Sequence, residues 1–143
     1  MIDVSRTTPL PATTLWPLLS DVRRWGDWLP TVDSVTPVEP DRPDEVGASY
    51  VVVQPGLPRA TWTITAWTPG RSFTWESRAR GVRSTGTHDL VEGPDGTTIR
   101  LGIRWEGPLA GLVRWLVGRK AADYVTREAA ALESTAAART TGA

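Results

Sequence analysis

The sequence predicts an α+β fold in which a curved antiparallel sheet of about seven strands wraps around one long C-terminal helix. Three observations lead to this prediction. Most segments between residues 31 and 105 alternate apolar and polar side chains, which is typical of strands with one buried face. Short loops rich in glycine and proline separate these segments, which favours antiparallel hairpins. Residues 107–133 repeat apolar side chains at spacings of three and four, the pattern of an amphipathic helix.

The chain begins with a predicted strand and two short helices. Residues 2–7 alternate apolar and polar side chains, which predicts a strand, and two prolines close it. Residues 12–19 carry four large apolar side chains and predict a short helix, which Pro17 is expected to kink or end. Residues 21–28 predict a second short helix or turn, and Pro30 ends it.

Six more strands follow, and one long helix closes the domain. The strands are expected at residues 32–38, 48–54, 60–67, 71–78, 83–92 and 97–105. Each has one apolar face, so the sheet is half-buried, and the helix over residues 107–133 is the only large surface that can cover it. A ligand would occupy the gap between the sheet and the helix. We expect one domain over residues 1–133 and a frayed polar tail over residues 134–143.

Composition and charge exclude several classes of protein. The 143 residues are the size of one domain, and 16 basic residues balance 16 acidic ones, which argues against a non-specific nucleic-acid binder. The chain has no cysteine and one histidine, His88, which excludes disulfides, thiolate sites and multi-histidine metal sites. No cofactor is expected, because the sequence lacks a GxSxG elbow, a phosphate loop and a dinucleotide fingerprint. With no signal or transmembrane segment in view, we expect a soluble cytoplasmic protein without integral membrane association.

Several segments resemble a known superfamily in their order and spacing. They are LWPLLSDVRRWGDWLP (15–30), VGASYVVVQPGLP (46–58), TWTITAWTPGRSFTWES (61–77), GTHDL (86–90), DGTTIRL (95–101) and GPLAGLVRWLVGRKAADYVTREAAALE (107–133). Together they resemble the SRPBCC (START-like) superfamily, in particular its polyketide cyclase/dehydrase and lipid-transport branch. The resemblance covers residues 2–133 and implies the helix-grip fold.

The resemblance implies an apolar cavity between the sheet and the C-terminal helix. Members of the superfamily bind or carry hydrophobic molecules, or cyclise and dehydrate aromatic polyketides, and their catalytic residues differ between subfamilies. Only cavity-facing positions can therefore be transferred to this chain. The hydrophobic small molecule that it would bind is the one partner that the resemblance implies.

Strand alternation and, for Tyr124, the apolar face of the long helix identify the side chains that would face this cavity. Either face of residues 48–54 could point inward, and we favour the face that carries Gln54. The candidate ligand contacts are Gln54, Trp62, Phe73, Trp75, Ser77, Leu90, Leu101, Ile103, Trp105 and Tyr124. Ala66 would lie on the same face as Trp62. If Trp62, Trp75 and Trp105 all point inward, they form an aromatic wall that suits flat polycyclic or isoprenoid ligands. The alternative is that these tryptophans only pack the core.

His88 and Tyr50 are the candidate catalytic residues. His88 is the only side chain whose ordinary pKa lies near neutrality, so it could shuttle a proton, orient a ligand or only support the structure. Tyr50 could polarise a ketone, or its hydroxyl could reach solvent from the core. Two functions from different classes stay open. The first is a cyclase or dehydratase that folds a poly-β-keto chain for aldol closure and water loss. The second is a carrier of a hydrophobic ligand without turnover.

The start of the long helix is locally basic. Arg114, Arg119 and Lys120 could attract anionic lipid heads or form a solvated helix face. The sequence does not fix the oligomeric state and is compatible with a homodimer.

Overall fold

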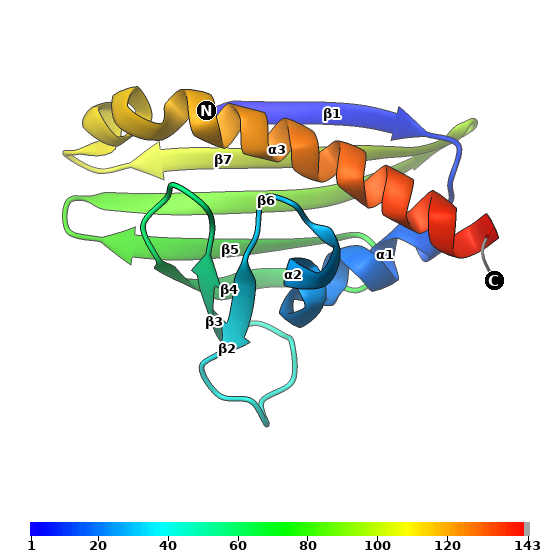
Figure 1. Ribbon diagram of the computed structural model, residues 1–143, viewed down its shortest axis with the longest axis horizontal. Helices are drawn as coiled ribbons and strands as arrows, with labels where there is room; N and C mark the ends of the chain where they lie inside the picture. Colours follow the sequence, from blue (N-terminus) through cyan, green and yellow to red (C-terminus); the bar gives the residue numbers. More distant parts are fainter. Residues whose placement is uncertain (142–143) are drawn as a thin grey trace.

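A seven-stranded antiparallel sheet forms the body of the computed structural model, which describes residues 1–141 (Figure 1). Its strands are β1 (Ile2–Thr8), β2 (Ser34–Pro37), β3 (Ser49–Val53), β4 (Ala60–Thr68), β5 (Ser72–Ala79), β6 (Val82–Gly93) and β7 (Gly96–Glu106). The order across the sheet is β1-β7-β6-β5-β4-β3-β2, so only the pairing of β1 with β7 joins strands that are far apart in the sequence. The predicted α+β helix-grip fold and its seven strands are confirmed.

The helices lie on one face of this sheet (Figure 1). They are α1 (Ala12–Ser20), the 3₁₀ turn η1 (Val22–Arg24), α2 (Trp25–Trp28) and α3 (Ala110–Thr141). Helix α3 crosses the sheet obliquely over β7 and β1 and meets α1, while η1 and α2 pack beside β2. None of the helices in residues 1–141 is long and apolar enough to span a membrane.

Pro17 does not end α1, which continues to Ser20. The proline removes one backbone hydrogen bond from the helix. Leu15, Leu18 and Leu19 on the same helix are all buried, and this burial offsets the lost bond.

A β-bulge in β4 changes which side chains face the core. The pairing with β5 shifts between Ile64 and Ala66, so the alternation of the strand reverses at that point. Trp67 therefore joins the core and packs against Phe73, with ring centroids 5.5 Å apart, whereas Ala66 is exposed. The expectation that Ala66 faces inward is wrong, because a strict period of two cannot show an inserted residue.

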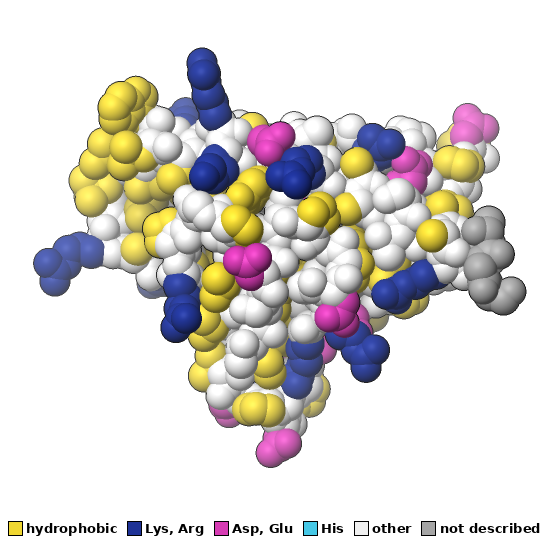
Figure 2. Space-filling model, in the orientation of Figure 1, with side chains coloured by type: hydrophobic (Ala, Val, Ile, Leu, Met, Phe, Trp, Pro, Cys, Tyr) yellow, Lys and Arg dark blue, Asp and Glu magenta, His cyan; other side chains and the backbone are white. Residues whose placement is uncertain are grey.

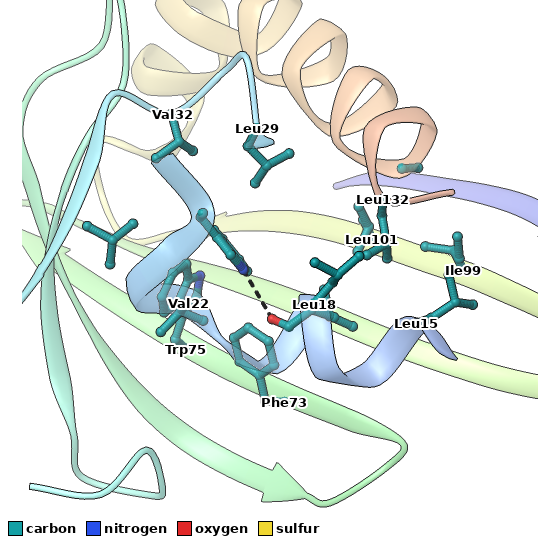
Figure 3. Close-up of a cluster of buried hydrophobic side chains, with 14 of the residues drawn as sticks. Leu15, Leu18, Val22, Leu29, Val32, Phe73, Trp75, Ile99, Leu101 and Leu132 are labelled. Atoms are coloured by element: carbon teal, nitrogen blue, oxygen red, sulfur yellow. Dashed lines mark hydrogen bonds between the residues drawn. The ribbon is translucent and has the colours of Figure 1, made fainter. Parts of the chain in front are cut away.

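The hydrophobic core fills the space between the sheet, the short helices and α3. Figure 3 shows Phe73 of β5 and Leu101 of β7 facing Leu15 and Leu18 of α1, with Leu132 of α3 closing the cluster. All five side chains are buried. The core thus joins both ends of the chain to the middle strands.

Helix α3 is longer than predicted. It continues without a break from residue 133 to Thr141, and Ala136 is only 1% exposed and belongs to the core. The predicted frayed tail is therefore wrong for residues 134–141, and residues 142–143 lie outside the described residues. Small alanine side chains let this last part of the helix approach the core closely, a role that composition alone does not indicate.

We predict that Ala136→Asp lowers the free energy of unfolding by about 3 kcal/mol, because it buries an unpaired carboxylate. The matched control is Ala138→Asp, two residues further on the same helix, where the side chain is exposed. It should change the stability by less than about 0.5 kcal/mol. Urea unfolding measures both variants, and equal small effects would show that this end of α3 does not pack.

Candidate functional site

A pocket of about 80 Å³ lies between the sheet and α3. It is lined by Trp25, Val32, Val52, Gln54, Leu57, Trp62, Trp75, Gly86, His88, Gly102, Ile103, Ala121, Tyr124, Val125 and Glu128. Pockets that hold drug-sized ligands measure roughly 300–1,000 Å³, so this one is small. A large ring system would fit only if lining side chains moved.

The pocket brings together about half of the predicted ligand contacts. Gln54, Trp62, Trp75, Ile103 and Tyr124 line it, and so does His88. The other predicted contacts do not line it and are Phe73, Ser77, Leu90, Leu101 and Trp105. Of these, only Ser77 is not fully buried, and the four apolar side chains serve to pack the protein.

Two of the three predicted wall tryptophans meet at the pocket. The rings of Trp62 and Trp75 lie 5.5 Å apart, and Trp25 of α2 packs edge-on against Trp75 at 5.2 Å. The Trp25 indole donates a hydrogen bond to the carbonyl of Leu19 at 3.1 Å, which holds its ring in the core. The aromatic wall is therefore Trp62, Trp75 and Trp25, with Trp105 outside it.

Gly86 makes room for this wall. It pairs with Trp75 across β5 and β6, and a Cβ at residue 86 would lie 2.8 Å from the Trp75 Nε1 atom. Such a distance is shorter than van der Waals contact, so the indole can lie over the strand only because residue 86 has no side chain.

His88 is buried next to this wall. Its ring stacks on Phe73 with centroids 4.1 Å apart, and its Nδ1 lies 3.2 Å from the Phe73 carbonyl oxygen. Burial lowers the pKa of His88 to about 4, although the carbonyl opposes this shift. The imidazole is thus neutral at pH 7. Because a carbonyl only accepts, Nδ1 carries the proton and Nε2 is left as an acceptor.

Glu128 of α3 is the site residue that sequence reasoning missed. Its Oε1 accepts a hydrogen bond from the Thr31 hydroxyl at 3.1 Å and a longer one from the Gln54 amide at 3.5 Å. The same amide donates to the Thr31 carbonyl at 3.3 Å. A carboxyl group of α3 is therefore held against an otherwise apolar wall by residues from two other parts of the chain.

Burial raises the pKa of Glu128 to about 7, and the hydrogen bond from Thr31 opposes the rise. Glu128 and His88 also line a second hollow of about 10 Å³, so the two groups lie near each other. One group is half ionised near neutrality and the other is uncharged. Opposite pKa shifts in one pocket are typical of sites that transfer protons.

The sequence did contain a signal for Glu128. Residues 124, 128 and 132 follow each other at a spacing of four on the helix, so Glu128 lies between the apolar side chains of Tyr124 and Leu132 on one face. A single acid within an apolar helix face is unusual, because burying an unpaired carboxylate costs free energy. An acid on the apolar face of a helix therefore indicates a candidate site residue.

Tyr50 lies outside the pocket. Its hydroxyl donates a hydrogen bond to Asp44, whose carboxylate also meets the Arg23 Nε atom at 3.1 Å. Burial and the Asp44 carboxylate raise the pKa of Tyr50. The phenol therefore holds the loop before β3 and does not face a ligand in the pocket, unlike the expectation for a group that polarises a ketone.

Tyr124 lines the pocket with its ring, but its hydroxyl is occupied. It donates to the carbonyl of Pro55, which follows β3. The contact ties the middle of α3 to the loop between β3 and β4. The polar groups that a ligand can reach are therefore Glu128, Gln54 and the Nε2 atom of His88. No group of three metal-ligating side chains occurs within residues 1–141.

A comparison with protein families finds one that matches nearly all of the chain. A family model described as polyketide cyclase / dehydrase and lipid transport matches residues 1–138. No curated protein matches the sequence. The predicted resemblance to the SRPBCC (START-like) superfamily is confirmed.

Solved structures show the same fold at low sequence identity. The di-domain ARO/CYC StfQ from the steffimycin biosynthetic pathway superposes with a TM-score of 0.76 at 11% identity, over 98% of this chain and 51% of that protein. A Thalictrum flavum norcoclaurine synthase point mutant, in complex with a transition-state analogue, has a TM-score of 0.72 at 16% identity over 97% and 94%. The protein TTHA0849 from Thermus thermophilus has a TM-score of 0.70 at 22% identity over 96% and 97%.

We predict that Gly86→Ala displaces Trp75 and lowers the free energy of unfolding by about 1–3 kcal/mol through overpacking. Gly93→Ala is the matched control, because it lies on the same strand and its Cβ would meet no atom within 4 Å. Urea unfolding and near-ultraviolet circular dichroism measure the two variants. An unchanged aromatic signal in Gly86→Ala would contradict the close approach of the indole.

The shifted pKa values of Glu128 and His88 also predict how the free energy of unfolding depends on pH. The pKa of Glu128 is higher in the folded state than its ordinary 4.5, so its contribution to stability is lost as pH rises from about 4.5 to 7. The pKa of His88 is lower than its ordinary 6.5, so its contribution grows as pH rises from about 4 to 6.5. The two effects oppose each other in the native chain.

Single variants should separate these effects. Glu128→Gln should remove the falling contribution, so that its stability relative to the native chain rises by roughly 2–3 kcal/mol between pH 4.5 and 7. The stability of His88→Gln relative to the native chain should instead fall as pH rises from about 4 to 6.5. Urea unfolding at several pH values gives the difference curves. A constant offset between Glu128→Gln and the native chain at every pH would show that this carboxyl titrates normally.

Proposed function

The chain belongs to the polyketide cyclase / dehydrase and lipid transport family, and we propose that it binds a small hydrophobic ligand bearing a carbonyl group in the pocket beneath α3. The observation that carries this proposal is the Glu128 carboxyl group, held by Thr31 and Gln54 in a wall of tryptophans. An apolar pocket with a few convergent polar groups and shifted pKa values is the usual form of a ligand site.

The size and shape of the pocket support an aromatic ligand. Trp62, Trp75 and Trp25 offer flat faces and edges, against which an aromatic or isoprenoid ring packs favourably. The free volume of about 80 Å³ favours one ring over several unless the wall moves. A carbonyl oxygen of the ligand would accept a hydrogen bond from protonated Glu128, and a hydroxyl group would donate to the Nε2 atom of His88.

Glu128 is better suited than His88 to transfer a proton in this pocket. Its pKa of about 7 lets it both give and take a proton near neutrality, whereas His88, with a pKa of about 4, is a weak base that stays neutral. In an aldol closure, ionised Glu128 would take a proton from a carbon next to a carbonyl. The carbanion would attack a second carbonyl and form the carbon–carbon bond.

The same group can complete the reaction. Protonated Glu128 would return its proton to the new alkoxide and become ionised again. It would then take a second proton from the carbon next to the carbonyl and give it to the departing hydroxide, which leaves as water while the carbon–carbon double bond forms. His88 would hold the hydroxyl group of the ligand, and Gln54 would position the Glu128 carboxyl. The reaction is neutral in charge and needs no cofactor, so the side chains of the pocket supply every proton transfer.

A carrier without turnover is the second candidate. It is favoured by the hydrogen bonds that already occupy Tyr124 and Tyr50, which leave few polar groups for chemistry. A carrier needs the aromatic wall and one anchoring group but no proton transfer. The two candidates therefore share a pocket and differ in whether Glu128 must titrate during function.

We predict saturable quenching of tryptophan fluorescence by an aromatic ketone. The probes are acetophenone, 2-acetonaphthone and 1,8-dihydroxyanthraquinone, which add rings in steps. Because protonated Glu128 donates to the carbonyl, affinity should fall about tenfold between pH 6 and pH 8 as this group ionises. Glu128→Gln should bind without this pH dependence. The matched control Glu133→Gln lies on the same helix outside the pocket and should keep it.

The outcomes distinguish the proposal from its alternatives. Quenching that never saturates with any probe would contradict a ligand site in this pocket. A poly-β-ketone that the native protein cyclises and Glu128→Gln converts at least about a hundredfold more slowly would establish the enzyme. Binding of the same compound without conversion by the native protein would establish the carrier.

A further inference from the structure

Leu109 and the first turns of α3, residues 110–120, carry an exposed apolar surface that no other part of the described chain, residues 1–141, covers. Leu109, Leu112, Trp115 and Leu116 are all exposed, and Trp115 is 80% exposed. The buried residues of α3 begin only at Ala121. Figure 2 shows hydrophobic side chains gathered at the end of the molecule where α3 begins. An apolar patch that includes so exposed a tryptophan is typical of an interaction site on a small protein.

Basic side chains surround these apolar residues. Six exposed basic residues lie on the first half of α3, at the end of β5 or on the two loops beside the helix, and they are Arg59, Arg78, Arg80, Arg114, Arg119 and Lys120. None of the six forms an ion pair within the described residues 1–141. Together with the four apolar residues they form what we call the apolar–basic surface.

Two contacts place the loops beside the helix. The Leu109 amide donates to the carbonyl of Gly81 at 2.9 Å, which fixes the turn between β5 and β6 against the start of α3. The Lys120 ammonium lies over Gly56 of the loop between β3 and β4. The positive charges of both loops thus add to those of the helix.

Acidic groups do not neutralise this end of the protein. Residues 107–122 contain no acid. Glu76 and Glu106, on the neighbouring strands, are both paired with Arg83, at 3.3 and 2.9 Å. The whole chain has no net charge, so the local excess of positive charge reflects an uneven distribution of charge.

We propose that the apolar–basic surface docks on an anionic lipid bilayer. Exposed leucines and a tryptophan with basic neighbours are the composition of a helix that lies in the membrane interface, where the indole enters the headgroup region and arginines meet phosphates. A second copy of this chain fits less well, because a two-fold contact would oppose two groups of positive charge without carboxylates between them.

Docking in this way would bring the pocket close to the membrane. Lys120 on the apolar–basic surface is followed at once by Ala121 and then by Tyr124, and both of these line the pocket. Leu57, which lines the pocket as well, belongs to the loop beneath Lys120. A hydrophobic molecule could pass between bilayer and pocket along α3. The docking proposal stands on the surface alone, whatever the pocket binds.

Co-sedimentation with large vesicles tests the proposal. We expect the full-length protein to sediment with vesicles of phosphatidylcholine and phosphatidylglycerol, far less with phosphatidylcholine alone, and less as salt is added. Arg114→Gln and Arg119→Gln should each lower the partition coefficient about fivefold, and together about twenty-five-fold. Arg139→Gln, near the other end of the same helix, is the matched control and should have no effect.

A second pair of variants tests how much the apolar side chains contribute to vesicle binding. Trp115→Ala should lower vesicle binding several-fold, whereas Val91→Ala, on an exposed residue of β6, should not. Circular dichroism confirms that each variant is folded. Absence of binding to anionic vesicles, or binding that ignores Trp115→Ala and both arginine variants, would overturn the proposal. A dimer in analytical ultracentrifugation that Trp115→Ala dissociates would also overturn it, because a second copy would then occupy the surface.

Discussion

The packing of the second half of α3 is the constraint on which the rest of this structure depends. From Ala121 onward the helix presents small and apolar side chains to the sheet and to α1, and Ala129, Leu132 and Ala136 are almost fully buried. Small side chains allow close approach, so this part of the helix acts as the lid of the core. Before Ala121 the helix has no such partner within residues 1–141. The pocket lies at the start of the buried half, where Ala121, Tyr124, Val125 and Glu128 of α3 line it.

This position explains why a carboxyl group can persist in the pocket wall. Glu128 is close enough to the core to lose much of its hydration, yet Thr31 in the loop before β2 and Gln54 directly after β3 both reach it. A group in such a place is stable in either protonation state, because hydrogen bonds support the charged form and burial supports the neutral form. His88 on β6 stays neutral because burial lowers its pKa. The pocket thus combines two polar groups of different character within aromatic surroundings.

The sequence predicted the sheet well and the site in part. Alternation and loop composition located all seven strands, because a half-buried strand imposes a period of two. Alternation predicted the wrong inward residue at the bulge in β4, where Trp67 and not Ala66 lies on the inner face. Glu128 was missed because periodicity identifies the apolar positions of an amphipathic helix and does not show which of its acids is buried. The position of the Tyr50 hydroxyl depends on Asp44 in the long loop between β2 and β3, whose course no local pattern determines.

The small volume of the pocket has a consequence for kinetics. The rings that line it also pack on one another, so a ligand much larger than the free volume of about 80 Å³ can enter only after lining side chains, such as those of Trp62 and Trp75, move. Entry is then limited by the rate of this opening and not by diffusion of the ligand, and the observed rate of association levels off as ligand concentration rises. The same rearrangement must occur before the ligand leaves. Residence time is therefore set by the aromatic wall of the protein as much as by the chemistry of its occupant.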